Sequence, residues 1–158
     1  MATSFTAENQ LGRFSLGMAH RFAVQLAGLP IGNWSKASGL KVQWKPLEHR
    51  PGDVVNGVWW YPGTTSYDPI KLGRAVDQKN TTMTFQTLEK ISSSNVPVPG
   101  LIQMYDSQNV LVYSWTLDNA FPVSWEIDAF DAGASKVALE TLTIQHSGFL
   151  NDETKLGI

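Results

Sequence analysis

Residues 40–63 read LKVQWKPLEHRPGDVVNGVWWYPG, and this stretch decides the fold. Its first six residues alternate apolar and polar side chains, which is typical of a β-strand with one apolar face. We expect the apolar set to face the domain core and the polar set to face away. The apolar set is Leu40, Val42 and Trp44, and the polar set is Lys41, Gln43 and Lys45. Pro46 interrupts the alternation, so we expect a bulge or bend beside it.

The same stretch predicts a long β-hairpin. Turn-forming residues at 51–53 and 56–57 mark its tip. Residues 58–61 begin the returning strand, which we expect Pro62-Gly63 to end. Since a two-stranded ribbon is only marginally stable in water, the hairpin is expected to find partners along its exposed edges.

The rest of the chain predicts many short strands and one helix. The helix is expected to begin at Asp77 or Asn80 and to run to about Ile91, with Phe85, Leu88 and Ile91 on one face. Strands are expected at 21–26, 31–35, 70–74, 101–105, 111–117, 121–127 and 136–146. This order predicts a mainly β protein, a small β-barrel or sandwich with one accessory α-helix and a long protruding β-hairpin.

Three parts of the chain are expected. Residues 1–20 form an N-terminal arm, residues 21–150 form the β-barrel domain, and residues 151–158 form a C-terminal tail. The arm carries Phe5, Leu11 and Phe14 without clear periodicity. Because ordering a free arm would cost about 1–2 kcal/mol per residue, we expect a neighbouring subunit to order it.

The six tryptophans separate into core and surface candidates. Trp59 and Trp60 cannot face the same way on a strand, so one of them leaves the core and is expected to contact a neighbouring subunit. A stacking platform for nucleic acid is the rival reading, but no basic groove accompanies these residues. The expected core comprises Phe22, Val24, Leu26, Leu40, Val42, Trp44, Trp115 and Trp125.

Composition excludes several functional classes. The formal net charge is −2 and no run of five like charges occurs, so nothing indicates an electrostatic nucleic-acid binder. There is no cysteine, which excludes disulfides and thiolate metal sites. The first residues lack the pattern of a secretory signal, and no apolar run approaches the ~18 residues that would cross a membrane, so no membrane insertion is expected.

Catalytic patterns are also absent from the sequence. His20, His49 and His146 lie far apart and match no metal-ligand spacing. The S-x-x-K match at 38–41 leads into a strand and lacks its partner motifs, so it is read as coincidental. We therefore expect no enzyme activity, cofactor or metal. A monomeric β-barrel that binds a small apolar ligand stays open as an alternative.

Six segments, in order, resemble the tail tube family of contractile phages, tailocins and extracellular contractile injection systems. The segments occur in the same order and at similar spacing as in that family, between about residues 20 and 150. The segments are 22–24 (FAV), 37–40 (ASGL), 48–52 (EHRPG), 62–74 (PG followed by IKLGR), 115–125 (W, then NAFP, then W) and 137–148 (VALE, then HSG).

The resemblance implies a structural subunit of hexameric rings that stack into an inner tube. In such tubes the long hairpins join into one barrel around a channel that carries protein effectors or DNA. It implies sheath and baseplate proteins as partners, and assembly in the bacterial cytoplasm into a virion or phage-tail-like particle that can be released from the cell. A tube-initiator paralogue at the baseplate junction is the alternative. The channel lining is then expected from Lys41, Gln43 and Lys45, and the subunit interface from Phe5, Leu11, Phe14, Pro51, Gly52, Asp53, Trp59 and Trp60.

Overall fold

The structure, a computed structural model, describes residues 21–52, 56–129, 131–133 and 135–150. The expected N-terminal arm and C-terminal tail lie outside these residues. Of the expected interface residues, Phe5, Leu11, Phe14 and Asp53 lie outside them as well.

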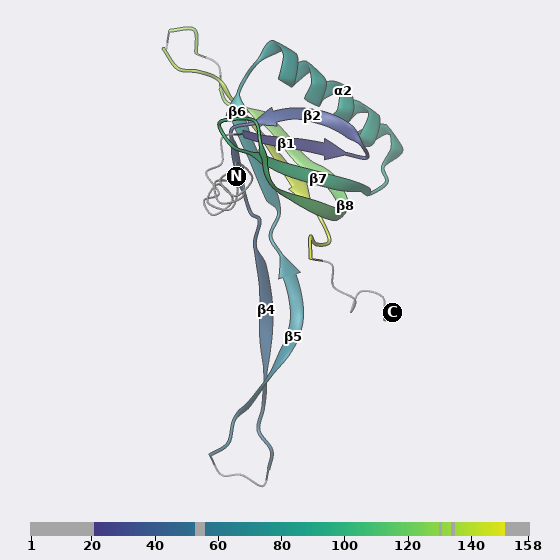
Figure 1. Ribbon diagram of the computed structural model, residues 1–158, viewed down its shortest axis with the longest axis vertical. Helices are drawn as coiled ribbons and strands as arrows, with labels where there is room; N and C mark the ends of the chain where they lie inside the picture. Colours follow the sequence, from purple (N-terminus) through teal and green to yellow (C-terminus); the bar gives the residue numbers. More distant parts are fainter. Residues whose placement is uncertain (1–20, 53–55, 130, 134, 151–158) are drawn as a thin grey trace, which may run out of the picture.

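Nine strands and one helix make up the described part of the chain (Figure 1). Seven strands form one antiparallel sheet in the order β2-β1-β7-β8-β9-β6-β3, and β4 and β5 form a separate hairpin. The elements are β1 Arg21–Leu26, β2 Leu29–Trp34, β3 Lys36–Ser38, β4 Val42–His49, β5 Trp59–Tyr67, β6 Ile70–Ala75, α2 Gln78–Ser94, β7 Val98–Tyr105, β8 Leu111–Ile127 and β9 Leu139–Gln145.

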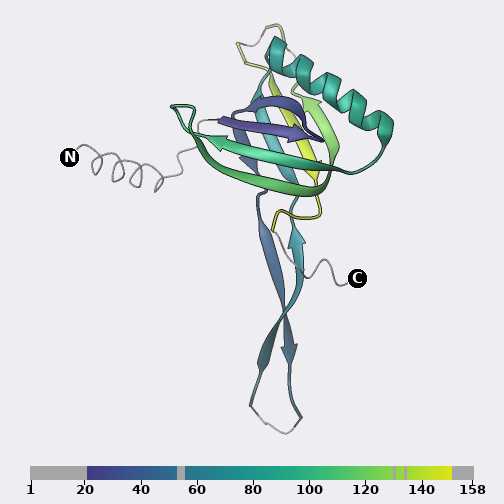
Figure 2. The same ribbon diagram turned by 45° about the vertical axis from the view of Figure 1, so that its right-hand side comes forward.

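The expected mainly β fold with one helix and a protruding hairpin is confirmed, but the sheet does not close into a barrel. Its two edge strands, β2 and β3, are consecutive in the chain, and among the described residues no strand ladder joins β2 to β3 or to β6. The curled sheet still wraps one core (Figure 2). That core comprises Val24, Leu26, Ile31, Trp34, Ile70, Leu72, Ile91, Ile102, Leu117, Ala120, Leu142 and Ile144.

A buried arginine fills the open seam between β2 and β6. The Arg74 side chain is 4% exposed, and its guanidinium binds both carboxylate oxygens of Glu140, with Nε 2.9 Å from Oε2 and Nη2 3.1 Å from Oε1. It also donates from Nη1 to the Ile31 and Asn33 carbonyls of β2, at 3.3 and 3.1 Å. The guanidinium carbon of Arg74 lies 3.9 Å from the centroid of the Trp34 ring. Hydrogen bonds from one side chain therefore take the place of the missing strand ladder.

Helix α2 covers the β2 edge through threonines. Thr84 donates from Oγ1 to the Ile31 carbonyl at 2.7 Å, and Thr87 donates to the Pro30 carbonyl at 3.0 Å. The buried helix residues are Thr84, Thr87 and Ile91, whereas Phe85 is 54% exposed and its ring centroid lies 6.1 Å from that of Trp125. The edge strand offers carbonyl groups to the helix, and short hydroxyl side chains satisfy them better than an aromatic ring can.

Strand β8 contains an extra residue that moves two side chains outward. The β8–β9 register shifts between Pro122 and Ser124, which makes Val123 the bulged residue. Phe121 and Val123 are therefore exposed, at 41% and 59%, while Trp125 packs against the core. Strict alternation would place residues 121, 123, 125 and 127 on one face, but the bulge reverses strand parity and separates the first two from Trp125.

Gly32 is required at the seam, and its replacement by alanine tests this. Gly32 has φ +89°, and a Cβ there would lie 2.6 Å from Arg74 Nη1 and 2.9 Å from Asn80 Oδ1. Gly28 is the matched control because its φ is +75° and a Cβ there meets nothing within 4 Å. Both substitutions should cost about 1–2 kcal/mol for the positive φ. Gly32→Ala should cost about 1–3 kcal/mol more, from overpacking. Urea unfolding measures both, and equal losses would contradict the steric role.

Candidate assembly site

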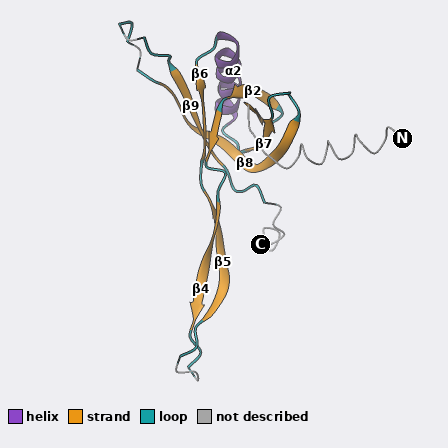
Figure 3. Ribbon diagram, turned by 60° about the vertical axis from the view of Figure 1, so that its left-hand side comes forward, coloured by secondary structure: helices purple, strands orange, loops and turns teal. Residues whose placement is uncertain are grey.

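The β4–β5 hairpin leaves the body of the protein and pairs with no other strand in the described part of the chain (Figures 1 and 3). Within the hairpin, β4 pairs with β5 from Val42 opposite Tyr67 to His49 opposite Trp59. The returning strand passes through Pro62-Gly63 and ends at Tyr67, so the expectation that Pro62-Gly63 ends it is wrong. Within the ranges that the structure describes, no strand lies along either outer edge of the ribbon, so both edges can pair with another chain.

The bulge expected beside Pro46 is confirmed, and the extra residue lies on β5. Trp44 is opposite Thr65 and Pro46 is opposite Pro62, so two residues of β5 face the single residue Lys45. A Cβ on Gly63, one of those two residues, would collide with the Lys45 carbonyl oxygen. Glycine therefore allows the two backbones to approach closely at this point.

The register divides the hairpin side chains between two faces, because residues directly opposite each other share a face. We name them the Trp44 face and the Leu47 face. The Trp44 face holds Val42, Trp44, Pro46, Glu48, Trp60, Pro62, Thr65 and Tyr67. The Leu47 face holds Gln43, Lys45, Leu47, His49, Trp59, Tyr61 and Ser66.

Large apolar side chains on the hairpin are exposed in the single chain. Trp44, Leu47, Trp59 and Tyr61 are 51% to 59% exposed, and Trp60 is 62% exposed. The prediction that Trp44 belongs to the domain core is therefore wrong, because β4 has left the sheet before reaching Trp44 and only β5 pairs with it. Isolated exposed apolar residues are ordinary, but a contiguous group marks an interaction surface.

The remaining predicted site residues occupy several positions. Gln43 and Lys45 share the Leu47 face and are exposed, whereas Lys41 precedes β4 and pairs with Asp68 at 3.7 Å. Pro51 is half-buried and Gly52 is exposed near the tip.

Among the predicted core residues, Val24 and Leu26 are buried, and Val42 is half-buried on the hairpin. Phe22, Leu40, Trp115 and Trp125 are partly buried and pack against the core.

A ring cluster that the sequence did not reveal holds the root of the hairpin. The Tyr67 ring centroid lies 5.6 Å from that of His146 and 5.2 Å from that of Phe149. His146 Nε2 is 3.0 Å from the Asp68 carbonyl oxygen. Gly39 sits on the other side of the root with φ +90°, where a Cβ would collide with the Pro69 carbonyl oxygen. The resemblance to tail tube proteins includes His146, in the HSG segment, but assigns it no contact.

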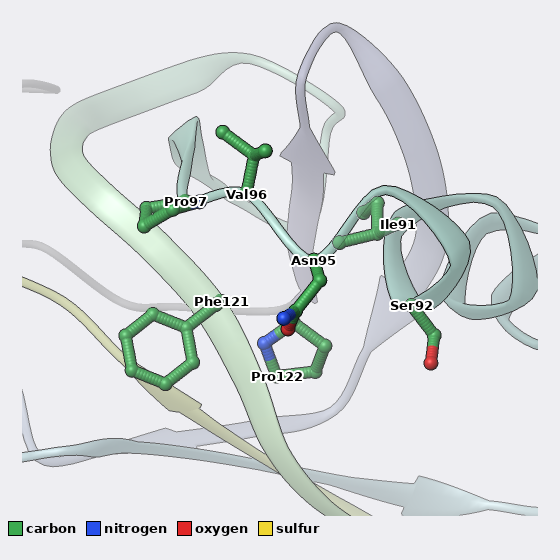
Figure 4. A pocket seen from close by; sticks show the side chains of 7 residues that line it. All are labelled: Ile91, Ser92, Asn95, Val96, Pro97, Phe121 and Pro122. Atoms are coloured by element: carbon green, nitrogen blue, oxygen red, sulfur yellow. The ribbon is translucent and has the colours of Figure 1, made fainter.

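A shallow groove lies on the body, between the end of α2 and β8 (Figure 4). It has a volume of about 280 Å³ and is lined by Ile91, Ser92, Asn95, Val96, Pro97, Phe121 and Pro122, none of them charged.

Within the described ranges no group of three or more histidine, aspartate or glutamate side chains could bind a metal ion. No helix of the described residues is long and apolar enough to cross a membrane.

A curled antiparallel sheet, one helix and a long projecting hairpin define the class of fold. The chain matches the T4-like virus tail tube protein gp19 family over residues 18–150 and belongs to that family. The resemblance to tail tube proteins is thereby confirmed, and the family consists of structural tube proteins and not of enzymes.

Solved structures from contractile injection systems have a similar fold. A chain of the extended PVC sheath-tube complex, from an extracellular contractile injection system, aligns with a TM-score of 0.70 and 24% identity over 95% of this chain and 97% of that one. A chain of the PVC sheath/tube terminator aligns at 0.65 and 25% identity, over 83% and 92%. A chain of the anti-feeding prophage baseplate aligns at 0.64 and 20% identity, over 85% and 93%. No curated protein sequence matched.

Proposed function

We propose that this protein is the inner-tube subunit of a contractile injection particle, in which hexameric rings stack around a channel for protein or DNA cargo. One observation carries the proposal: on a chain of the tail tube family, a long hairpin pairs with no third strand among the described residues and exposes large apolar side chains. Ring neighbours would supply the missing edge partners. Closing the sheet edges around a ring removes the liability of free strand edges.

The partners and location follow from the same role. A sheath would surround the tube and a baseplate would hold its first ring. The particle would assemble in the bacterial cytoplasm and act after release. In this role the N-terminal arm, with Phe5, Leu11 and Phe14, and the hairpin tip, with Pro51 to Asp53, contact neighbouring copies. Gln43 and Lys45 face the channel beside Lys41.

Electron microscopy of the purified full chain tests the proposal. Negative-stain images should show tubes whose end-on views have six-fold symmetry, and size-exclusion chromatography should show assemblies above the monomer. A tube-initiator paralogue would stop at single rings. A compact monomer at all concentrations, with a small molecule detected by native mass spectrometry, would instead support a ligand-binding protein and contradict the assembly role.

A further inference from the structure

Most of the large apolar side chains of the hairpin change sides at the bulge. In the root segment, residues 42–45 with 64–67, the large apolar side chains of Val42, Trp44 and Tyr67 lie on the Trp44 face. In the tip segment, residues 46–49 with 59–62, Leu47, Trp59 and Tyr61 lie on the opposite face, while Trp60 stays on the Trp44 face with the two prolines. The extra β5 residue opposite Lys45 marks the change.

We propose that the hairpin contacts a second copy of this chain through its Trp44 face in the root segment and through its Leu47 face in the tip segment. The surface left for the channel then switches faces at the bulge. This inference rests on the proposed tube function and names the surface that performs it. It also limits the channel role of the Leu47 face to Gln43 and Lys45.

The root segment has a clear sidedness. Tyr67, on the Trp44 face, already packs against His146 and Phe149 of its own body. Trp44 lies on the same face farther along the ribbon, where it is 56% exposed. The Trp44 face therefore continues a contact that the chain itself begins. The other face carries Gln43 and Lys45 here, both polar and exposed.

The tip segment has the reverse arrangement. Leu47, Trp59 and Tyr61 are 53%, 59% and 51% exposed on one face, and the His49 ring lies 6.2 Å from the Tyr61 ring in an edge-to-face arrangement. The opposite face carries Glu48, which forms an ion pair with Arg50, and Trp60 as its one large aromatic side chain, 62% exposed. Three adjacent large apolar side chains beside an aromatic pair form an anchor suited to a desolvated contact, whereas an ion pair suits a wet surface.

A second copy is the occupant that fits this surface. The tip segment lies beyond the seven-stranded sheet of its own chain (Figure 3), so among the described residues only β4 and β5 cover one another there. In the root segment, the exposed Trp44 continues along the same face a contact with this protein's own body that Tyr67 begins. A head-to-tail contact between identical chains presents another body at the same relative position in every copy.

Single-cysteine labelling tests the switch, since the chain has no cysteine of its own. Gln43→Cys, Trp44→Cys, Leu47→Cys and Glu48→Cys are each labelled with a small neutral maleimide before and after assembly. Assembly should slow labelling about tenfold or more at positions 44 and 47, which enter a desolvated interface, and by less than about twofold at positions 43 and 48. Protection at 48 with free labelling at 47 would overturn the switch.

Adjacent tryptophans on opposite faces provide a matched pair for microscopy. Trp59 and Trp60 are 59% and 62% exposed, so serine replaces a similar surface in each variant. Trp59→Ser should abolish tubes while Trp60→Ser forms them, with unchanged circular dichroism in both. If the parent protein forms no tubes, the proposed function itself fails. If the parent forms tubes and the two variants behave alike or in the reverse order, only the face assignment fails.

Discussion

Replacing Arg74 with methionine is expected to lower the free energy of unfolding by about 3–5 kcal/mol, the usual cost of leaving one partner of a buried ion pair alone. Glu140 is fully buried and accepts hydrogen bonds from Trp125 Nε1 at 2.7 Å and Thr81 Oγ1 at 2.9 Å. Those neutral donors do not compensate its charge. Chemical denaturation followed by tryptophan fluorescence measures the loss.

Two further variants separate the roles of Arg74. Arg50→Met is the control, because the Arg50 side chain is 74% exposed in its pair with Glu48 and should contribute only about 0–1 kcal/mol. The double variant Arg74→Met/Glu140→Met removes both buried charges and the hydrogen bond from Arg74 to the Asn33 carbonyl, while the Ile31 carbonyl keeps its bond from Thr84. It should therefore remain less stable than the parent by about 1–3 kcal/mol for the Asn33 carbonyl. Full recovery in the double variant would contradict the seam-filling role.

Proline in the root of the hairpin is expected to abolish rings and tubes without unfolding the body. Val42 and Gln43 are adjacent on β4, so their N–H groups point to opposite edges of the strand. Val42→Pro and Gln43→Pro thus remove one donor to β5 and one donor at the free edge. Each also fixes φ near −65°, which suits an extended ladder poorly.

The control for the proline variants is Lys41→Gln. Lys41 and Asp68 are both exposed and their ion pair spans 3.7 Å, so its loss should leave assembly nearly intact. Microscopy and circular dichroism of all three variants beside the parent provide the test. Normal tubes from both proline variants, with the body folded, would show that the hairpin does not join the subunits.

Strand alternation predicted much of this fold from sequence. Val24 and Leu26 are buried as the period of two in 21–26 requires, and the hairpin, its bulge beside Pro46 and the single helix all occur. Alternation misplaced Trp44, because periodicity shows which face of a strand is apolar but not whether other elements of the same domain cover that face. Phe121 and Val123 are exposed for a related reason, since one extra residue in β8 reverses the parity that strict alternation assumes.

The polar network at the seam could not be read from the sequence. Arg74 and Glu140 are 66 positions apart, and each is an ordinary charged residue on a short strand. Their pairing depends on β6 lying beside β9 and on the sheet remaining open at β2, both of which are long-range outcomes of packing. The threonine face of α2 was equally hidden, because threonine is a poor helix former and reads as a strand residue.

The ring cluster at the hairpin root bears on the entropy of association. The rings of Tyr67, His146 and Phe149 hold the end of β5 against the body before any partner arrives. Gly39, just before β4, has a backbone conformation that other residues rarely adopt. A protruding element whose direction is already set loses little orientational freedom when it docks, so more of its contact energy remains as affinity. The hairpin is thereby preorganised for docking onto a partner.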